Sequence, residues 1–276
     1  MRIIRFCISL IGFSLLCQGV SKAGGEFLPV GARSAGLAHA SVTLGDVWSV
    51  FHNPAGIASL QSISAGVYYE NRFGLPEMGL RAGAVALPFG KNAFGLNIRT
   101  YGYTLYSEQQ AGLTYARAFG DHLRIGMQLS YMGFRFSEYY GQKSLVTVTV
   151  GATYAFGKNL VLGAQIFNPN EQRISETGNE RIPSMIRFGA RYRFSKQVFV
   201  CSEVEQNLNT KPVLKAGIEY NPISVLILRA GISGNPRSSS FGFGLVFKKF
   251  QIDMAGNFHP VLGFTPQFGL TFNPGS

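Results

Sequence analysis

Phe89-Gly90-Lys91-Asn92 is the first of a series of similar turns that recur along this sequence. Each turn begins with an aromatic residue and continues with small, polar or proline-containing turn residues, and successive copies leave room for two strands and a loop. The other copies are Phe119-Gly120-Asp121-His122, Phe156-Gly157-Lys158-Asn159, Phe194-Ser195-Lys196-Gln197, Tyr220-Asn221-Pro222-Ile223 and Phe247-Lys248-Lys249-Phe250. This spacing, with an aromatic residue at each strand end, is typical of an up-and-down β-barrel in a membrane.

The stretches between these turns alternate apolar and polar residues over runs of about ten residues, the length at which a tilted strand crosses the hydrocarbon layer. In 144–156, Val146, Val148 and Val150 share one face, while Thr149 and Thr153 share the other. A soluble antiparallel sheet also alternates in this way. The aromatic residues at the turns fall on the apolar faces, as a lipid-facing girdle requires, so the sequence favours a membrane barrel over a soluble β-protein.

The alternation predicts an all-β fold, a transmembrane antiparallel up-and-down β-barrel of about 14 strands. The even strand number would place both ends of the barrel in the periplasm, with tight turns on that side and loops outside the cell. The longest loop, 168–183, is polar and is expected to be extracellular. The predicted strands are 62–72, 78–88, 92–103, 109–119, 122–136, 144–156, 159–168, 184–194, 197–206, 213–220, 223–233, 239–248, 250–258 and 262–272.

The first residues have the three parts of a secretory signal peptide. Met1 to Arg5 is basic, 6–17 is mostly apolar, and Ser21-Lys22-Ala23 provides small residues at the cleavage site. We therefore expect cleavage near Ala23 and a location in the outer membrane of a Gram-negative cell. The predicted organisation is a signal peptide at 1–23, an N-terminal hatch or plug segment at 24–60 and an outer-membrane β-barrel at 61–276.

Charge and motif content exclude several classes of function. Cleavage after Ala23 would remove three of the 25 basic residues and none of the 14 acidic ones, which leaves a net charge of +8. These charges lie singly rather than in a basic run, so nucleic-acid binding is not expected. The mature chain would keep Cys201 alone and form no internal disulfide. Because no metal-ligand spacing and no catalytic-serine motif occurs, the sequence predicts no metal, no cofactor and no enzyme activity.

Charged residues in the eighth to eleventh predicted strands alternate with the apolar face and should point into the barrel. They are Arg187, Arg191, Arg193, Glu203, Glu205, Lys215, Glu219 and Arg229. They form either a polar lumen that contacts a substrate or a ladder of paired charges along the inner wall. Neighbouring strands carry opposite charges that can satisfy one another, which favours the ladder.

A segment of different composition precedes the first predicted strand. It is too apolar for a free periplasmic tail, and it contains a run of small residues at 31–38, Asp46 and the motif Asn53-Pro54-Ala55-Gly56. Pro54 restrains Asn53 to an extended backbone and Gly56 permits a tight turn, so the motif predicts a fixed bend. A small, apolar and bent segment fits inside the periplasmic mouth of a barrel as a hatch.

The sequence resembles the FadL-type outer-membrane superfamily, and more closely its PorV/PorQ proteins of Bacteroidota. The likeness rests on Gly31-Ala32-Arg33-Ser34-Ala35-Gly36-Leu37-Ala38, on Asp46, and on Asn53-Pro54-Ala55-Gly56 leading into a barrel strand. It implies a fourteen-stranded barrel with an N-terminal hatch, in which Asn53, Pro54 and Ala55 are hatch residues and Asp46 contacts the hatch or the barrel wall. FadL proteins pass long-chain fatty acids and other hydrophobic compounds, whereas PorV-like members serve the type IX secretion system.

Two functions follow from this resemblance. The first is a PorV/PorQ-type protein that binds secretion-system or secreted cargo proteins and assists secretion or surface attachment. The alternative is a FadL-like passive transporter of long-chain fatty acids or other hydrophobic small molecules; a small general porin is a third, weaker hypothesis. The inward charges weigh against an apolar path through that half of the barrel, but Ala84, Val85 and Leu87 leave both faces apolar beside the first four strands. Gly95 or Gly102 offers a kink there, although ordinary barrel curvature also accounts for both glycines.

Overall fold

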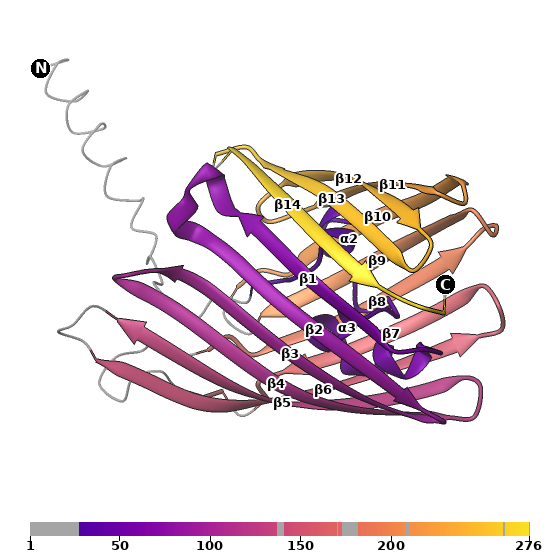
Figure 1. The fold of residues 1–276 in the computed structure, drawn as a ribbon, viewed down its shortest axis with the longest axis horizontal. Helices are drawn as coiled ribbons and strands as arrows, with labels where there is room; N and C mark the ends of the chain where they lie inside the picture. Colours follow the sequence, from indigo (N-terminus) through magenta and orange to yellow (C-terminus); the bar gives the residue numbers. More distant parts are fainter. Residues whose placement is uncertain are drawn as a thin grey trace, which may run out of the picture.

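The chain forms a closed antiparallel β-barrel of 14 strands in a computed structural model (Figure 1). The structure describes residues 28–136, 141–169, 171–172, 182–207, 210–261 and 263–275, so the predicted signal peptide lies outside the described residues. Each strand pairs with its neighbours in sequence, and β1 (Ser64–Asn71) closes the ring against β14 (Gly263–Phe272). The predicted fold class and strand number are therefore confirmed.

The other strands match the predicted ones closely in position. They are β2 (Gly79–Phe89), β3 (Asn92–Tyr103), β4 (Tyr106–Phe119), β5 (Leu123–Phe136), β6 (Gln142–Phe156), β7 (Leu160–Phe167), β8 (Met185–Arg193), β9 (Val198–Asn207), β10 (Val213–Ile223), β11 (Leu226–Ser233), β12 (Ser238–Phe247) and β13 (Phe250–His259). Two short 3-10 helices, η2 (Arg72–Gly74) and η3 (Pro76–Met78), lie between β1 and β2. The short connections run from an even-numbered strand to the next strand, as from β2 to β3. We call the end of the barrel where they lie the turn end, and the opposite end the loop end.

Backbone geometry explains why a glycine follows the aromatic residue in three of these turns. Gly90, Gly120 and Gly157 have φ values of 59°, 64° and 63°, in the left-handed region that only glycine enters at little cost. The preceding Phe89, Phe119 and Phe156 end their strands with exposed side chains. The pattern therefore combines a tight turn with an outward aromatic residue.

One predicted turn is wrong. Tyr220-Asn221-Pro222-Ile223 lies within β10, and the turn to β11 is formed by Ser224 and Val225. The pairing of β10 with β11 shifts its register between Tyr220 and Ile223. Because proline has no N–H to donate to the β-ladder, Pro222 marks an irregularity in the strand here instead of its end.

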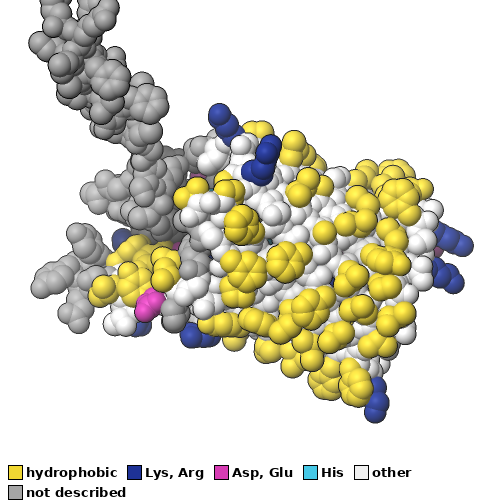
Figure 2. All heavy atoms as spheres, turned by 90° about the horizontal axis from the view of Figure 1, so that it is seen from above, with side chains coloured by type: hydrophobic (Ala, Val, Ile, Leu, Met, Phe, Trp, Pro, Cys, Tyr) yellow, Lys and Arg dark blue, Asp and Glu magenta, His cyan; other side chains and the backbone are white. Residues whose placement is uncertain are grey.

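The outer face of the barrel is apolar between its two ends (Figure 2). Alternate strand residues such as Leu96, Ile98 and Leu113 have more than half of their surface exposed, whereas their neighbours in sequence point inward. Charged side chains project near the two ends of the molecule in Figure 2. An exposed apolar band with charges at its edges is the surface of a membrane-spanning barrel. Within the described ranges, no helix is long and apolar enough to cross a membrane.

Candidate functional site

The described part of the N-terminal segment, residues 28–60, lies inside the barrel (Figure 1). It contains α2 (Ala32–Gly36), α3 (Ser49–His52) and the 3-10 helix η1 (Pro54–Ser59). α2 packs on β11 to β14, and η1 packs on β3 to β6, so the segment crosses from one wall to the opposite wall. The Leu28 carbonyl accepts a hydrogen bond of 2.6 Å from Nη1 of Arg99, nearer the loop end of β3. The segment therefore extends deeper than the mouth in which the sequence places it.

Glycines on the inner wall bring the strands into close contact with this segment. Ten strands each place a glycine against it, and we call this set the inner glycine ring: Gly66, Gly95, Gly126, Gly151, Gly163, Gly189, Gly217, Gly231, Gly242 and Gly269. A Cβ atom on Gly151 would lie 2.0 Å from Asn53 Oδ1, and one on Gly126 would lie 2.5 Å from the Ala55 nitrogen. The segment is thus packed against the wall around most of the circumference, and the barrel is filled at this level.

Asn53 holds the segment to the wall by its side chain. Its Nδ2 donates to the Val42 carbonyl at 2.7 Å and to the Ala152 and Ala164 carbonyls of β6 and β7 at 3.2 and 3.3 Å. Its Oδ1 accepts from the Ala55 N–H at 3.2 Å and so caps η1. The side chain is fully buried, which makes each of these hydrogen bonds costly to lose.

We expect Asn53→Ala to loosen the segment and to lower the free energy of unfolding by about 1–3 kcal/mol, because it leaves buried backbone groups without a partner. Trp48 is the only tryptophan of the chain and packs inside the barrel, so its fluorescence emission reports on the segment directly. The measurement is the Trp48 emission maximum during urea unfolding in detergent micelles. Asn92→Ala, at an exposed turn contact with Tyr115, is the matched control and should leave the emission of the folded protein unchanged.

Arg187 and Glu203 form a buried ion pair that also binds the backbone of the segment. Their closest approach is 2.7 Å, and both side chains are almost completely buried. Oε2 of Glu203 accepts from the N–H groups of Ser41 and Val42, both at 2.8 Å. Arg187 donates to the carbonyls of His52 and His39 at 3.2 and 3.3 Å. The pair therefore fixes two parts of the segment at once.

The charge of Arg187 also affects the His52 side chain. Burial, together with the positive charge of Arg187, lowers the pKa of His52 to about 3. The imidazole is therefore neutral at physiological pH, and the segment places no additional positive charge beside the guanidinium.

A second set of charges links the segment to β10, β11 and β13. Arg33 pairs with Asp46 at 3.1 Å within the segment and with Glu219 at 2.9 Å on the wall. Arg229 in turn pairs with Glu219 at 2.8 Å and with Asp253 at 2.6 Å. Opposite charges thus alternate from Asp46 to Asp253 without a gap. The sequence predicts Asp46, Glu219 and Arg229 as candidate site residues, but it does not predict Arg33 and Asp253 as their partners.

The remaining predicted residues lie at the edges of these sets. Lys215 pairs with Glu205 at 2.6 Å, and Glu205 lies 3.3 Å from Arg187. Arg191 places its guanidinium 5.6 Å from the centre of the Phe199 ring, and Arg193 is exposed at the turn end of β8. Pro54, Ala55 and Gly56 begin η1 and are buried; a Cβ atom on Gly56 would lie 2.5 Å from the Leu44 carbonyl oxygen.

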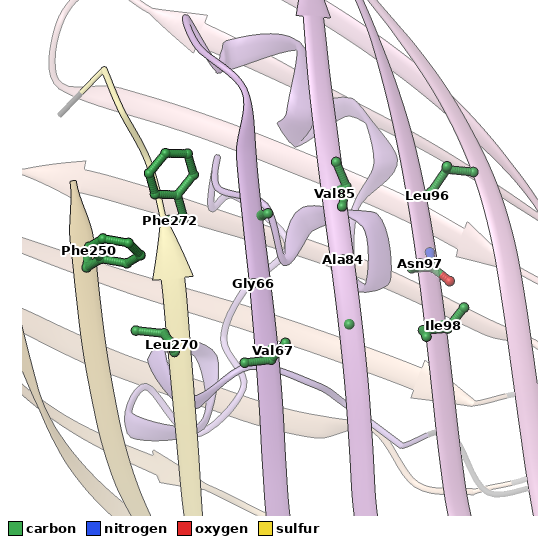
Figure 3. A pocket seen from close by; sticks show the side chains of 12 residues that line it. Gly66, Val67, Ala84, Val85, Leu96, Asn97, Ile98, Phe250, Leu270 and Phe272 are labelled. Carbon is green, nitrogen blue, oxygen red and sulfur yellow. The ribbon is translucent and has the colours of Figure 1, made fainter.

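A groove of about 450 Å³ lies on the outer wall where β13, β14, β1, β2 and β3 run side by side (Figure 3). Small outward residues, Ala65 and Gly83, leave space between larger apolar neighbours on the adjacent strands. Its lining is almost entirely apolar and consists of Ala65, Gly66, Val67, Gly83, Ala84, Val85, Leu96, Asn97, Ile98, Phe250, Leu270 and Phe272. The groove thus lies on the lipid-facing surface, beside the strands that the sequence predicts to be apolar on both faces.

The groove and the N-terminal segment share the same stretch of wall. Gly66 lines the groove and also contacts Trp48, because a Cβ atom there would lie 2.7 Å from the indole ring. Asn97 lines the groove and donates from Nδ2 to the Val50 carbonyl at 3.3 Å. The β2–β3 and β3–β4 ladders are continuous past Gly95 and Gly102, so neither glycine breaks the wall. A thin, closed wall of small residues therefore separates the groove from the segment.

No metal site is formed by the residues that the structure describes, since no three His, Cys, Asp or Glu side chains gather among them in a metal-binding arrangement.

Known structures resemble this fold, although no protein-family model and no curated protein matches the sequence. The toluene transporter TbuX of Ralstonia pickettii superposes with a TM-score of 0.65 at 12% identity, over 87% of this chain and 96% of that chain. The toluene transporter TodX of P. putida gives 0.65 at 13% identity, over 90% and 99%. A FadL homologue of Pseudomonas aeruginosa gives 0.62 at 13% identity, over 91% and 100%. At this identity the likeness shows the barrel fold alone.

Proposed function

We propose that this protein is a passive transporter of small hydrophobic compounds in the outer membrane of a Gram-negative bacterium. The observation that carries the proposal is the apolar groove on the lipid-facing wall, whose lining residues Gly66 and Asn97 contact the N-terminal segment from the other side. An apolar molecule released from the barrel interior at this wall would enter the membrane without crossing a polar layer. Because the wall is closed and the segment packs on its inner face, passage requires the segment to move away from β1 and β3 and the strands of this wall to part.

Two further observations support this function. The segment and the inner glycine ring fill the barrel at one level, which argues against an open aqueous pore of the general porin type. The similar structures include two toluene transporters, which makes monoaromatic hydrocarbons the substrate class to test first. Long-chain fatty acids are the second class, because the sequence resemblance implies them. The secretion-associated function of the PorV/PorQ type is the competing hypothesis, and it predicts a bound protein instead of an apolar ligand.

The test is the uptake of labelled toluene and of a labelled long-chain fatty acid by Gram-negative cells that lack their own transporter and express this protein. Val85→Trp should reduce uptake to the level of cells without the protein, because an indole at this outward position fills the groove. The control is Val204→Trp on β9, where the replaced side chain is similarly exposed, at 40% against 36% for Val85, but lies outside the groove. It should leave uptake unchanged.

Both variants place the new side chain on the lipid-facing surface, so neither should disturb folding. The retained electrophoretic mobility of the unheated barrel checks this. Equal uptake by wild type, Val85→Trp and Val204→Trp would exclude the groove from the route, and an absence of uptake by wild type would contradict the transport function itself.

A further inference from the structure

The charged residues of the barrel are distributed unequally between its two ends. The six connections at the turn end are all described, and they carry five basic residues and one acidic residue, Asp121. We call the five basic residues the basic ring: Lys91, Lys158, Lys196, Lys248 and Lys249. The sequences of the seven connections at the loop end carry five basic and five acidic residues, which cancel. The net positive charge of the connections is thus concentrated at the turn end.

The basic ring lies immediately beyond the outward aromatic residues. In four turns a lysine follows the exposed phenylalanine by two positions, as in Phe89 and Lys91. Lys248 Nζ lies 5.7 Å from the centre of the Phe247 ring, and the guanidinium of Arg117 lies 5.6 Å from the centre of the Phe119 ring. Aromatic residues of a membrane barrel mark the boundary between hydrocarbon and head groups. The cations are therefore expected at the depth of the lipid head groups. Figure 2 shows Lys and Arg side chains projecting at the right-hand end of the molecule.

The protein itself does not neutralise this ring. All five side chains are exposed, and among the described residues none of them forms an ion pair with a carboxylate. The acidic residues that pair with arginine or lysine, such as Glu203 and Glu219, lie inside the barrel instead. The counter-charge of the ring must therefore come from outside the protein.

We propose that the basic ring binds the phosphate-bearing head groups of anionic phospholipids in the leaflet that surrounds the turn end. The ring is distributed around the circumference, with four of the six turns contributing, and it has no compact patch of the kind that a folded acidic protein would cover. Each lysine near an anionic membrane surface adds to the attraction, and the attraction weakens with ionic strength. This interaction depends on the membrane barrel and not on what the barrel transports.

The test is native mass spectrometry of the protein after reconstitution into vesicles of equal parts phosphatidylglycerol and phosphatidylcholine and extraction in mild detergent. Wild type should retain phosphatidylglycerol in preference to phosphatidylcholine. The turn-end variant combines Lys91→Gln, Lys158→Gln, Lys196→Gln, Lys248→Gln and Lys249→Gln and should reduce this preference on the order of tenfold. The matched loop-half variant combines Arg81→Gln, Arg135→Gln, Lys143→Gln, Lys211→Gln and Arg237→Gln, removes the same charge from exposed positions, and should keep the preference.

Loss of the preference in both variants would show an effect of net charge alone and would overturn the proposal. The proposal would also be overturned if wild type shows no preference for phosphatidylglycerol, or if a stoichiometric acidic protein accompanies wild type but not the turn-end variant. If the turn-end variant does not insert into vesicles, the salt dependence of wild type decides, since the preference for phosphatidylglycerol should fall as ionic strength rises. A preference that does not respond to salt would contradict the electrostatic basis of the proposal.

Discussion

Glu203→Ala is expected to lower the free energy of unfolding by about 3–5 kcal/mol, the largest loss among the variants considered, because it removes the carboxylate closest to the buried Arg187 charge. It also leaves the N–H groups of Ser41 and Val42 without an acceptor. The N-terminal segment should therefore detach from β8 and β9 before the barrel unfolds. In urea titrations, Trp48 fluorescence should change at a lower concentration than the β-sheet signal in circular dichroism.

Glu205→Ala is the matched control for this variant. Glu205 belongs to the same group of charges, through Lys215 at 2.6 Å and Arg187 at 3.3 Å, but it forms no hydrogen bond with the described part of the segment. It should lower stability less and leave the Trp48 transition together with that of the barrel. If Glu205→Ala shifts the Trp48 transition as far as Glu203→Ala does, the segment is not held by the carboxylate of Glu203.

Gly151→Ala is expected to open the barrel to ions. The added Cβ would lie 2.0 Å from Asn53 Oδ1 and 2.9 Å from the Pro54 side chain. β6 cannot move away, because it is paired with β5 and β7 on both sides, so the segment must shift instead. Overpacking of this kind costs about 1–3 kcal/mol. In planar bilayers the variant should show a stable current that wild type does not show.

The control for this variant is Gly133→Ala in β5. A Cβ atom there would meet only the Tyr131 ring, at 3.8 Å, which is an ordinary van der Waals distance. The change should leave both stability and conductance as in wild type. A Gly151→Ala barrel that stays closed although a changed Trp48 fluorescence shows that the segment has shifted would show that the segment does not seal the interior.

The alternation of apolar and polar residues predicted the barrel well. Each strand has lipid on one side and the barrel interior on the other, so every second residue faces the same surroundings. The exception is β10, where Asn221 and Pro222 have the composition of a turn but lie at an irregularity of the ladder. Alternation also indicated that Arg187 and Glu203 face inward from adjacent strands. It could not show that the second oxygen of Glu203 binds the backbone of the N-terminal segment. The two residues that donate to this oxygen, Ser41 and Val42, precede Glu203 by 162 and 161 positions in the sequence.

The packing of the N-terminal segment against the barrel wall also could not be predicted from the sequence. The ten glycines of the inner glycine ring are visible in the sequence, and several occupy the inward phase of their strands. Curvature alone also accounts for a glycine in a strand, so their shared role becomes clear only when the segment is placed against them. The groove on the outer wall likewise depends on the register of β14, β1 and β2, which brings Ala65 and Gly83 between larger residues.

The most direct measurement is native mass spectrometry of the protein purified in mild detergent from the membrane of the cells that produce it. A transporter of hydrophobic compounds should carry a small apolar molecule in addition to phospholipid, and Val85→Trp should lose that molecule while Val204→Trp keeps it. A stoichiometric protein partner on a barrel without an apolar ligand would contradict the transport function and favour the secretion-associated one.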